Sequence, residues 1–141
     1  MKSGKIYRHE AFYRNASTGQ LERKYLVILA CTEGGDIVGR LLTSRAHGRP
    51  EEPRCFHGVP YPGFYLGVLG TPLVTKSWVD LRGFEDIDSA QFSRRQAAGV
   101  IKLVSSIPAD LQVDMLDCVA RADDTTRVQE NAIRDELARL R

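Results

Sequence analysis

The sequence lacks any apolar run of the roughly 20 residues that a bilayer-spanning helix needs, and its first residues contain no apolar stretch of the signal-peptide kind. It also lacks an excess of one charge, because 20 lysine and arginine residues face 18 aspartate and glutamate residues, which leaves a formal charge of +2. No global field therefore draws the chain to nucleic acid or to a membrane, and any basic site must be local. We expect a soluble, cytoplasmic protein with no membrane partner.

Cysteine is scarce as well. The three cysteines, Cys31, Cys55 and Cys118, are odd in number and far apart in the sequence. This pattern argues against the disulfide framework of a small secreted protein and against a zinc site built from paired thiolates, and it favours a reducing compartment. The chain also has no Walker loop, no dinucleotide-binding glycine pattern and no paired-carboxylate motif. We therefore expect no metal and no cofactor.

Short apolar runs separated by glycine- and proline-bearing turns predict a set of β-strands. The runs lie at residues 4–14, 24–30, 37–44, 64–70 and 72–81, and the β region is expected to end near residues 99–101. Between the third and fourth runs, residues 46–64 form a long insertion rich in proline and glycine. Connections of this length without regular structure are uncommon in compact domains and are often functional.

Two helices are predicted after the strands. The first, at about residues 108–121, begins near Pro108, whose missing N–H costs little at the first helical position. The second, at about residues 126–140, has Thr126 and Gln129 at the spacing of a capping box. The prediction is thus a single domain over residues 1–141, mainly β, with a barrel or strongly curved sheet at about residues 4–105 and helices at one side.

Five short features follow one another in a fixed order. They are GKIY at residues 4–7, RKYLVIL at residues 23–29, TS at residues 43–44, KSWVDL at residues 76–81 and the helix start at Pro108. Together they resemble the MazF/PemK family of toxin endoribonucleases over residues 4–120. The resemblance implies a small SH3-like curved-sheet barrel of the MazF/PemK/CcdB type, here with an extra C-terminal helix. It also implies a homodimer and a cognate antitoxin protein.

The same resemblance implies cleavage of single-stranded RNA without a metal, by attack of a 2′-hydroxyl on the neighbouring phosphate. Around that phosphate it implies catalytic roles for Thr43, Arg45, Lys24 and Arg23, with Ser44 as a substrate contact. The usual family arginine falls on Lys24, and an ammonium cannot make the planar bidentate contact of a guanidinium. From the residues alone, Thr43 is equally suited to an ordinary strand position and Arg45 to a solvated loop.

The insertion contributes further candidates for substrate binding: His57, Tyr61 and Phe64. Histidine transfers protons near neutral pH, and aromatic rings stack on unpaired bases. The same side chains would also suit a loop that packs onto its own sheet. The insertion therefore leaves a second function open, namely a non-catalytic SH3-like barrel that binds a protein or nucleic-acid partner through residues 46–64.

Overall fold

A single antiparallel sheet forms the centre of the computed structural model, which describes residues 3–141. Its strands are β1 (Lys5–Arg14), β2 (Leu21–Cys31), β3 (Ile37–Thr43), β4 (Cys55–Phe56), β5 (Gly63–Gly67), β6 (Ser77–Asp80) and β7 (Ile101–Ser106). They lie in the order β4-β5-β6-β3-β2-β1-β7. Since β4 and β7 are the two edges, the sheet is open and is not closed into a barrel.

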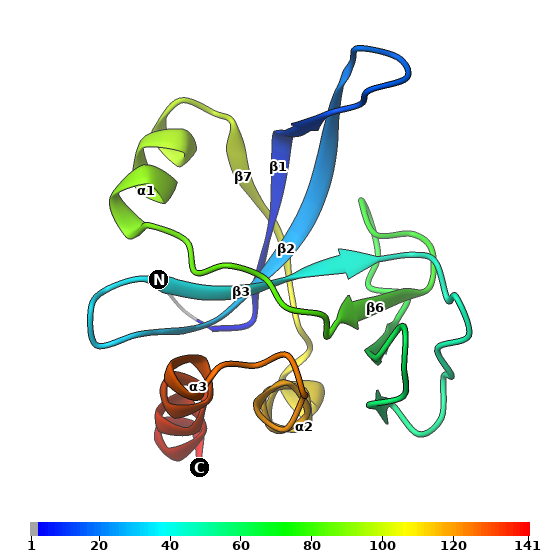
Figure 1. The fold of residues 1–141 in the computed structure, drawn as a ribbon, viewed down its shortest axis with the longest axis vertical. Helices are drawn as coiled ribbons and strands as arrows, with labels where there is room; N and C mark the ends of the chain where they lie inside the picture. The colour runs from blue at the N-terminus through cyan, green and yellow to red at the C-terminus, as the bar shows by residue number, and fades with distance from the viewer. Residues whose placement is uncertain (1–2) are drawn as a thin grey trace.

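Helices cover both faces of the sheet, as Figure 1 shows: α1 (Ser89–Ala97) lies on one side, and α2 (Ala109–Ala120) and α3 (Arg127–Leu140) lie together on the other. Neighbouring strand residues alternate between the two faces. Val27 therefore packs in the core beneath α2 and α3, whereas Leu26 packs against Phe92 of α1. Among the described residues, no helix has the length and apolar character needed to span a membrane.

The prediction of a mainly β protein with C-terminal helices is confirmed, whereas the sheet shows no barrel closure. Helix α1 was not expected, and strand β7 follows it, so the β region extends beyond residue 101. The local signal for α1 is Asp88, whose Oδ1 accepts a 2.8 Å hydrogen bond from the Gln91 N–H at the helix start. The insertion also contains a short strand, β4.

The two C-terminal helices begin where the sequence signals place them. Pro108 immediately precedes α2, and Thr126 caps α3 with both halves of a capping box present. Gln129, the second capping-box residue, is buried, and its Oε1 also accepts a 2.9 Å hydrogen bond from the guanidinium of Arg40. Arg40 is fully buried on β3, so this hydrogen bond ties the centre of the sheet to α3.

A disulfide joins Cys55 of β4 to Cys118 of α2, with the two Cα atoms 5.7 Å apart. The sequence pattern argued against a disulfide framework, and the structure nevertheless contains this disulfide. The two positions are 63 residues apart in the chain and meet only because α2 packs beside β4 and β5. Cys31 is a free, exposed cysteine at the end of β2.

Candidate functional site

A cleft of about 580 Å³ opens between the β1–β2 hairpin, the end of β3, the insertion and the segments that flank β6. Five cationic side chains line it: Arg23, Lys24, Arg45, Arg49 and Arg82. Four serine and threonine side chains line it as well: Thr43, Ser44, Thr75 and Ser77. No aspartate or glutamate is among the lining residues, all of which belong to the described part of the chain.

The charge of this cleft contrasts with that of the whole chain. Five of the 20 lysine and arginine residues meet here, although the formal net charge of the protein is only +2. Cations crowded into a concave surface repel one another and focus a positive potential into the cleft, where an anion relieves the repulsion. Guanidinium groups and hydroxyls are also suitable donors to phosphate oxygens. The residues that line the cleft are therefore of the types that suit an anionic ligand.

Lys24 and Thr43 lie just beyond the end of the β2–β3 pairing, whose last pair is Leu26 opposite Leu41. Lys24 of β2 is opposite His9 of β1, and Thr43 of β3 is opposite Trp78 of β6. Lys24 and Thr43 are both half-buried and both line the cleft.

The segment after Thr43 presents its neighbours to the same cleft. β3 ends at Thr43, whose Oγ1 accepts a 3.1 Å hydrogen bond from the Arg45 N–H. Arg45 therefore lies in a turn after the strand end, and strand alternation does not set its direction. Ser44, Arg45 and Arg23 are exposed at the cleft. The structure thus brings together all four residues expected to be catalytic, with Ser44 beside them.

Arg49 is a cleft residue outside the set of expected site residues. It is only 4% exposed, and its Nε and Nη1 donate hydrogen bonds to the carbonyl oxygens of Pro62 and Arg45 at 3.0 and 3.1 Å. Its Nη2 lies 3.3 Å from the Asp80 carboxylate as an ion pair, but without the alignment of a hydrogen bond. Nη2 of this buried guanidinium therefore has no hydrogen-bond acceptor.

Glycine at position 63 makes room for Arg49. A Cβ at Gly63 would lie 2.5 Å from Cδ of Arg49, closer than packed atoms tolerate. Gly63 is the first residue of β5, at the end of the insertion. The missing side chain at this position leaves the space that the side chain of Arg49, 14 residues earlier in the sequence, occupies. The only sequence signal for this arrangement is the glycine itself, which does not identify its partner.

Asp80, on β6, holds two arginines at the cleft. Its carboxylate accepts hydrogen bonds from Nε and Nη2 of Arg82, the shortest of them 2.7 Å, and it lies beside Arg49. Burial on its own would raise the pKa of Asp80. The hydrogen bonds and charge of Arg82, with the charge of Arg49, outweigh burial and keep the pKa below its ordinary value. An ionised Asp80 therefore positions both guanidinium groups.

Tyr61 contacts these cations through its ring. The guanidinium carbons of Arg49 and Arg82 lie 5.4 and 5.1 Å from the ring centroid, and the His47 ring stacks on it with centroids 4.9 Å apart. Cation–π attraction of this kind holds guanidinium groups in place. Tyr61 is thus part of the cleft wall, and its ring already has three neighbours.

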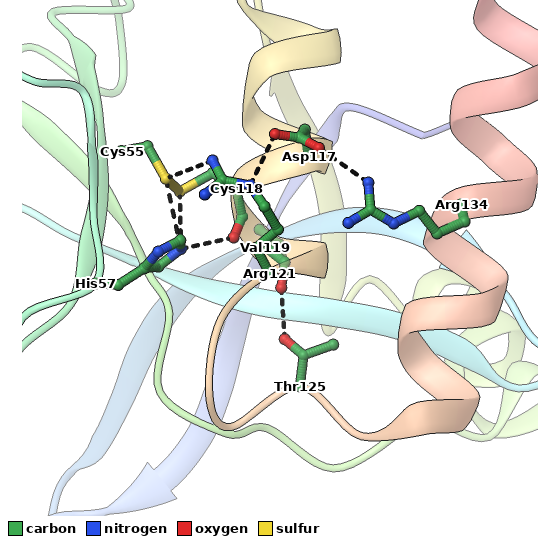
Figure 2. Close-up of a disulfide and its surroundings, with 8 residues drawn as sticks. All are labelled: Cys55, His57, Asp117, Cys118, Val119, Arg121, Thr125 and Arg134. Carbon is green, nitrogen blue, oxygen red and sulfur yellow. Dashed lines mark hydrogen bonds and ion pairs between the residues drawn. A yellow bond between two sulfur atoms is a disulfide. The ribbon is translucent and has the colours of Figure 1, made fainter.

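Two of the expected substrate contacts lie away from the cleft. Phe64 is 1% exposed and belongs to the main hydrophobic core. His57 lies beside the disulfide, where its Nε2 is 2.9 Å from the Cys118 carbonyl oxygen (Figure 2). The same Nε2 is 3.4 Å from Cys55 Sγ and 3.6 Å from Cys118 Sγ, and these three side chains form the group of potential metal ligands in the described chain.

No family model, curated protein or solved structure matches this chain in the comparisons with known proteins. The resemblance to the MazF/PemK family therefore stays an expectation drawn from the residues.

Proposed function

We propose that this protein is a toxin-like endoribonuclease that binds single-stranded RNA in the cation-rich cleft and cleaves it without a metal. The observation that carries the proposal is that Lys24 and Thr43 line one cleft together with four further cations and no carboxylate. A polyanion with hydroxyl groups suits such a surface, and the positive potential concentrates it there. The open, curved sheet is proposed to be a relative of the SH3-like barrels.

The proposed reaction is attack of a ribose 2′-hydroxyl on the adjacent phosphorus, which breaks the bond to the 5′ oxygen and leaves a cyclic phosphate. Negative charge accumulates on the phosphoryl oxygens in the transition state. Arg23 and Arg45 donate to these oxygens together with the Thr43 hydroxyl, while Ser44 contacts the substrate nearby. The proton of the attacking 2′-hydroxyl passes to water. The Lys24 ammonium lines the cleft together with Thr43 and is the proton-bearing group proposed for the leaving oxygen.

The test is incubation of the purified protein with unstructured RNAs in EDTA, with RNA binding measured in parallel by fluorescence anisotropy. Thr43→Ala and Arg45→Ala are each expected to slow cleavage by about 10²–10³-fold, the usual cost of losing one transition-state donor. Lys76→Ala is the matched control, because Lys76 is an exposed cation paired with Glu51 and does not line the cleft. The proposal fails if RNAs of several sequences neither bind nor break.

A second candidate function is binding without cleavage, through the wall that the insertion contributes. His47, Arg49 and Tyr61 of the insertion line the cleft, so the insertion and the proposed RNA site share one surface. Lysine in place of the family arginine favours this alternative, since it removes a bidentate contact to phosphate. Salt-sensitive binding of RNA that stays intact would select it over the nuclease.

The resemblance also leads us to propose a cytoplasmic location, a homodimer and an antitoxin whose flexible segment blocks the cleft. Sedimentation analysis at micromolar concentration tests the dimer, and a stable monomer would contradict it. An antitoxin that occupies the cleft would compete with RNA for the parent protein. It would bind Arg45→Ala more weakly, because that variant removes one of the cleft cations.

A further inference from the structure

The disulfide and its neighbours form a cluster with the donor set of a transition-metal site. Sγ of Cys55, Sγ of Cys118 and Nε2 of His57 all lie within 4.8 Å of one another. They come from β4, from the residues just after it and from α2, and Figure 2 shows the imidazole turned toward both sulfur atoms. We propose that reduction of the Cys55–Cys118 bond converts this cluster into a Zn²⁺ site with these three atoms as ligands.

The geometry around His57 agrees with tetrahedral zinc. Zn–S and Zn–N bonds of about 2.3 and 2.0–2.1 Å at a tetrahedral angle place nitrogen and sulfur roughly 3.5 Å apart. Nε2 of His57 lies 3.4 Å from one sulfur and 3.6 Å from the other. Reduction frees the two sulfur atoms to move apart around an ion, and three protein ligands leave the fourth position for water.

The surrounding charges suit a pair of thiolates. Nη2 of Arg121 lies 3.6 Å from Cys55 Sγ, so a positive charge faces this sulfur atom. Asp117 holds Arg121 in place through a 2.9 Å ion pair and also pairs with Arg134 of α3 (Figure 2). Two thiolates neutralise one Zn²⁺, so the metal adds no net charge to this partly buried place.

Conversion of the disulfide into a zinc site takes two steps, reduction and metal binding. A dithiol reductant forms its own cyclic disulfide and transfers two electrons and two protons to the sulfur atoms of Cys55 and Cys118. Zinc then displaces the two thiol protons, as metal binding to cysteine requires. The Nε2–H of His57 that donates to the Cys118 carbonyl is lost to solvent, and the neutral ring takes a proton on Nδ1 instead, which leaves the Nε2 lone pair for the metal.

Metal competition tests the proposal independently of any activity toward RNA. The full-length protein is reduced with a dithiol, desalted without oxygen and titrated with Zn²⁺ against a chromophoric chelator. The reduced parent is expected to bind one zinc per chain, and the oxidised parent none at this site. Cys55→Ser and His57→Gln are each expected to weaken binding by more than the roughly 10–100-fold that loss of an outer-shell partner costs.

Two further measurements make the result specific. Cys31→Ser is the matched control, because Cys31 is an exposed thiol outside the cluster and its loss should leave zinc affinity unchanged. Zinc should also raise the melting temperature of the reduced parent but not that of reduced Cys55→Ser, since a ligand stabilises only the fold that binds it. The two substituted residues, Cys55 and His57, are half-buried. Cys118 is left unchanged because it is fully buried, and its substitution would disturb the core. The proposal is overturned if either variant binds zinc as tightly as the reduced parent, or if the reduced parent binds none.

Discussion

Arg49 and Asp80 form a nearly buried ion pair behind the cleft. Nη2 of Arg49 lies 3.3 Å from Oδ1 of Asp80, and the two side chains are 1% and 10% exposed. Burial lowers the pKa of the Arg49 guanidinium, while the Asp80 charge acts in the opposite direction. The pair therefore keeps a cation at the cleft in a place where an isolated charge would be costly.

Asp80→Asn is expected to lower the free energy of unfolding by about 3–5 kcal/mol, because it leaves the buried Arg49 charge without its counter-charge. Urea denaturation at neutral pH measures the loss. Glu51→Gln is the matched control, since it removes one partner of the exposed Lys76–Glu51 pair and should change stability little. Equal losses in the two variants would show that the buried pair has no special role.

Phe64→Ala is expected to destabilise the fold by about 3–5 kcal/mol, the usual cost of removing a fully buried aromatic side chain. Phe64 is 1% exposed on β5, whereas Val68, just after that strand, is 60% exposed, so Val68→Ala is a suitable control. Thermal unfolding measures both variants. The opposite pattern, with stability retained and RNA affinity lost in Phe64→Ala, would assign Phe64 to substrate binding.

The predictable parts of this molecule are those fixed by local sequence. Apolar runs bounded by turn residues identified β1, β2 and β3, and Thr126 with Gln129 identified the start of α3. Helix α1 escaped prediction because Phe92 is its only buried residue, so it has no apolar stripe to detect. The disulfide and the role of Arg49 depend on loops and on contacts between distant segments, which spacing along the chain does not reveal.

Gln129→Ala is expected to lower the free energy of unfolding by about 1–3 kcal/mol or more, because it removes an acceptor from the buried Arg40 guanidinium together with two further hydrogen bonds. The Gln129 amide accepts from Arg40 Nη2 at 2.9 Å and donates to the Phe84 carbonyl and Asp86 carboxylate at 3.0 and 2.8 Å. Gln91→Ala on the exposed face of α1 is the control for loss of a glutamine from a helix. If both variants unfold at the same urea concentration, the amide does not anchor β3 to α3.

The stability of the fold is expected to fall as the pH drops below 6.5. Burial of His9 lowers its pKa below that value, and the Arg95 charge adds to the effect against the opposing charge of Glu10. The unfolded chain then binds the proton more readily than the folded chain, so acidification through this range favours unfolding. Stability continues to fall until the pH is below the pKa of His9 in the folded protein.

His9→Gln removes this titration, so its stability should depend less on pH than that of the parent. Urea denaturation of both proteins from about pH 8 to about pH 5 measures the difference, over the range around the unperturbed histidine pKa. Parallel curves for the two proteins would assign the pH dependence to other groups.

The β1–β2 hairpin projects beyond the helices in Figure 1, and its outer half carries Arg23 and Lys24 on β2. Past His9, β1 pairs only with β2, and the register between them shifts before Tyr13. Such bulges increase the local twist of a strand pair. Lys24 lies opposite His9, where β7 still supports β1, whereas Arg23 lies beyond it, in the part of the hairpin that only two strands form. Arg49 on the opposite wall is fixed to the body of the protein by its hydrogen bonds. The distance between Arg23 and that wall therefore depends on the twist of two strands and not on the packed core.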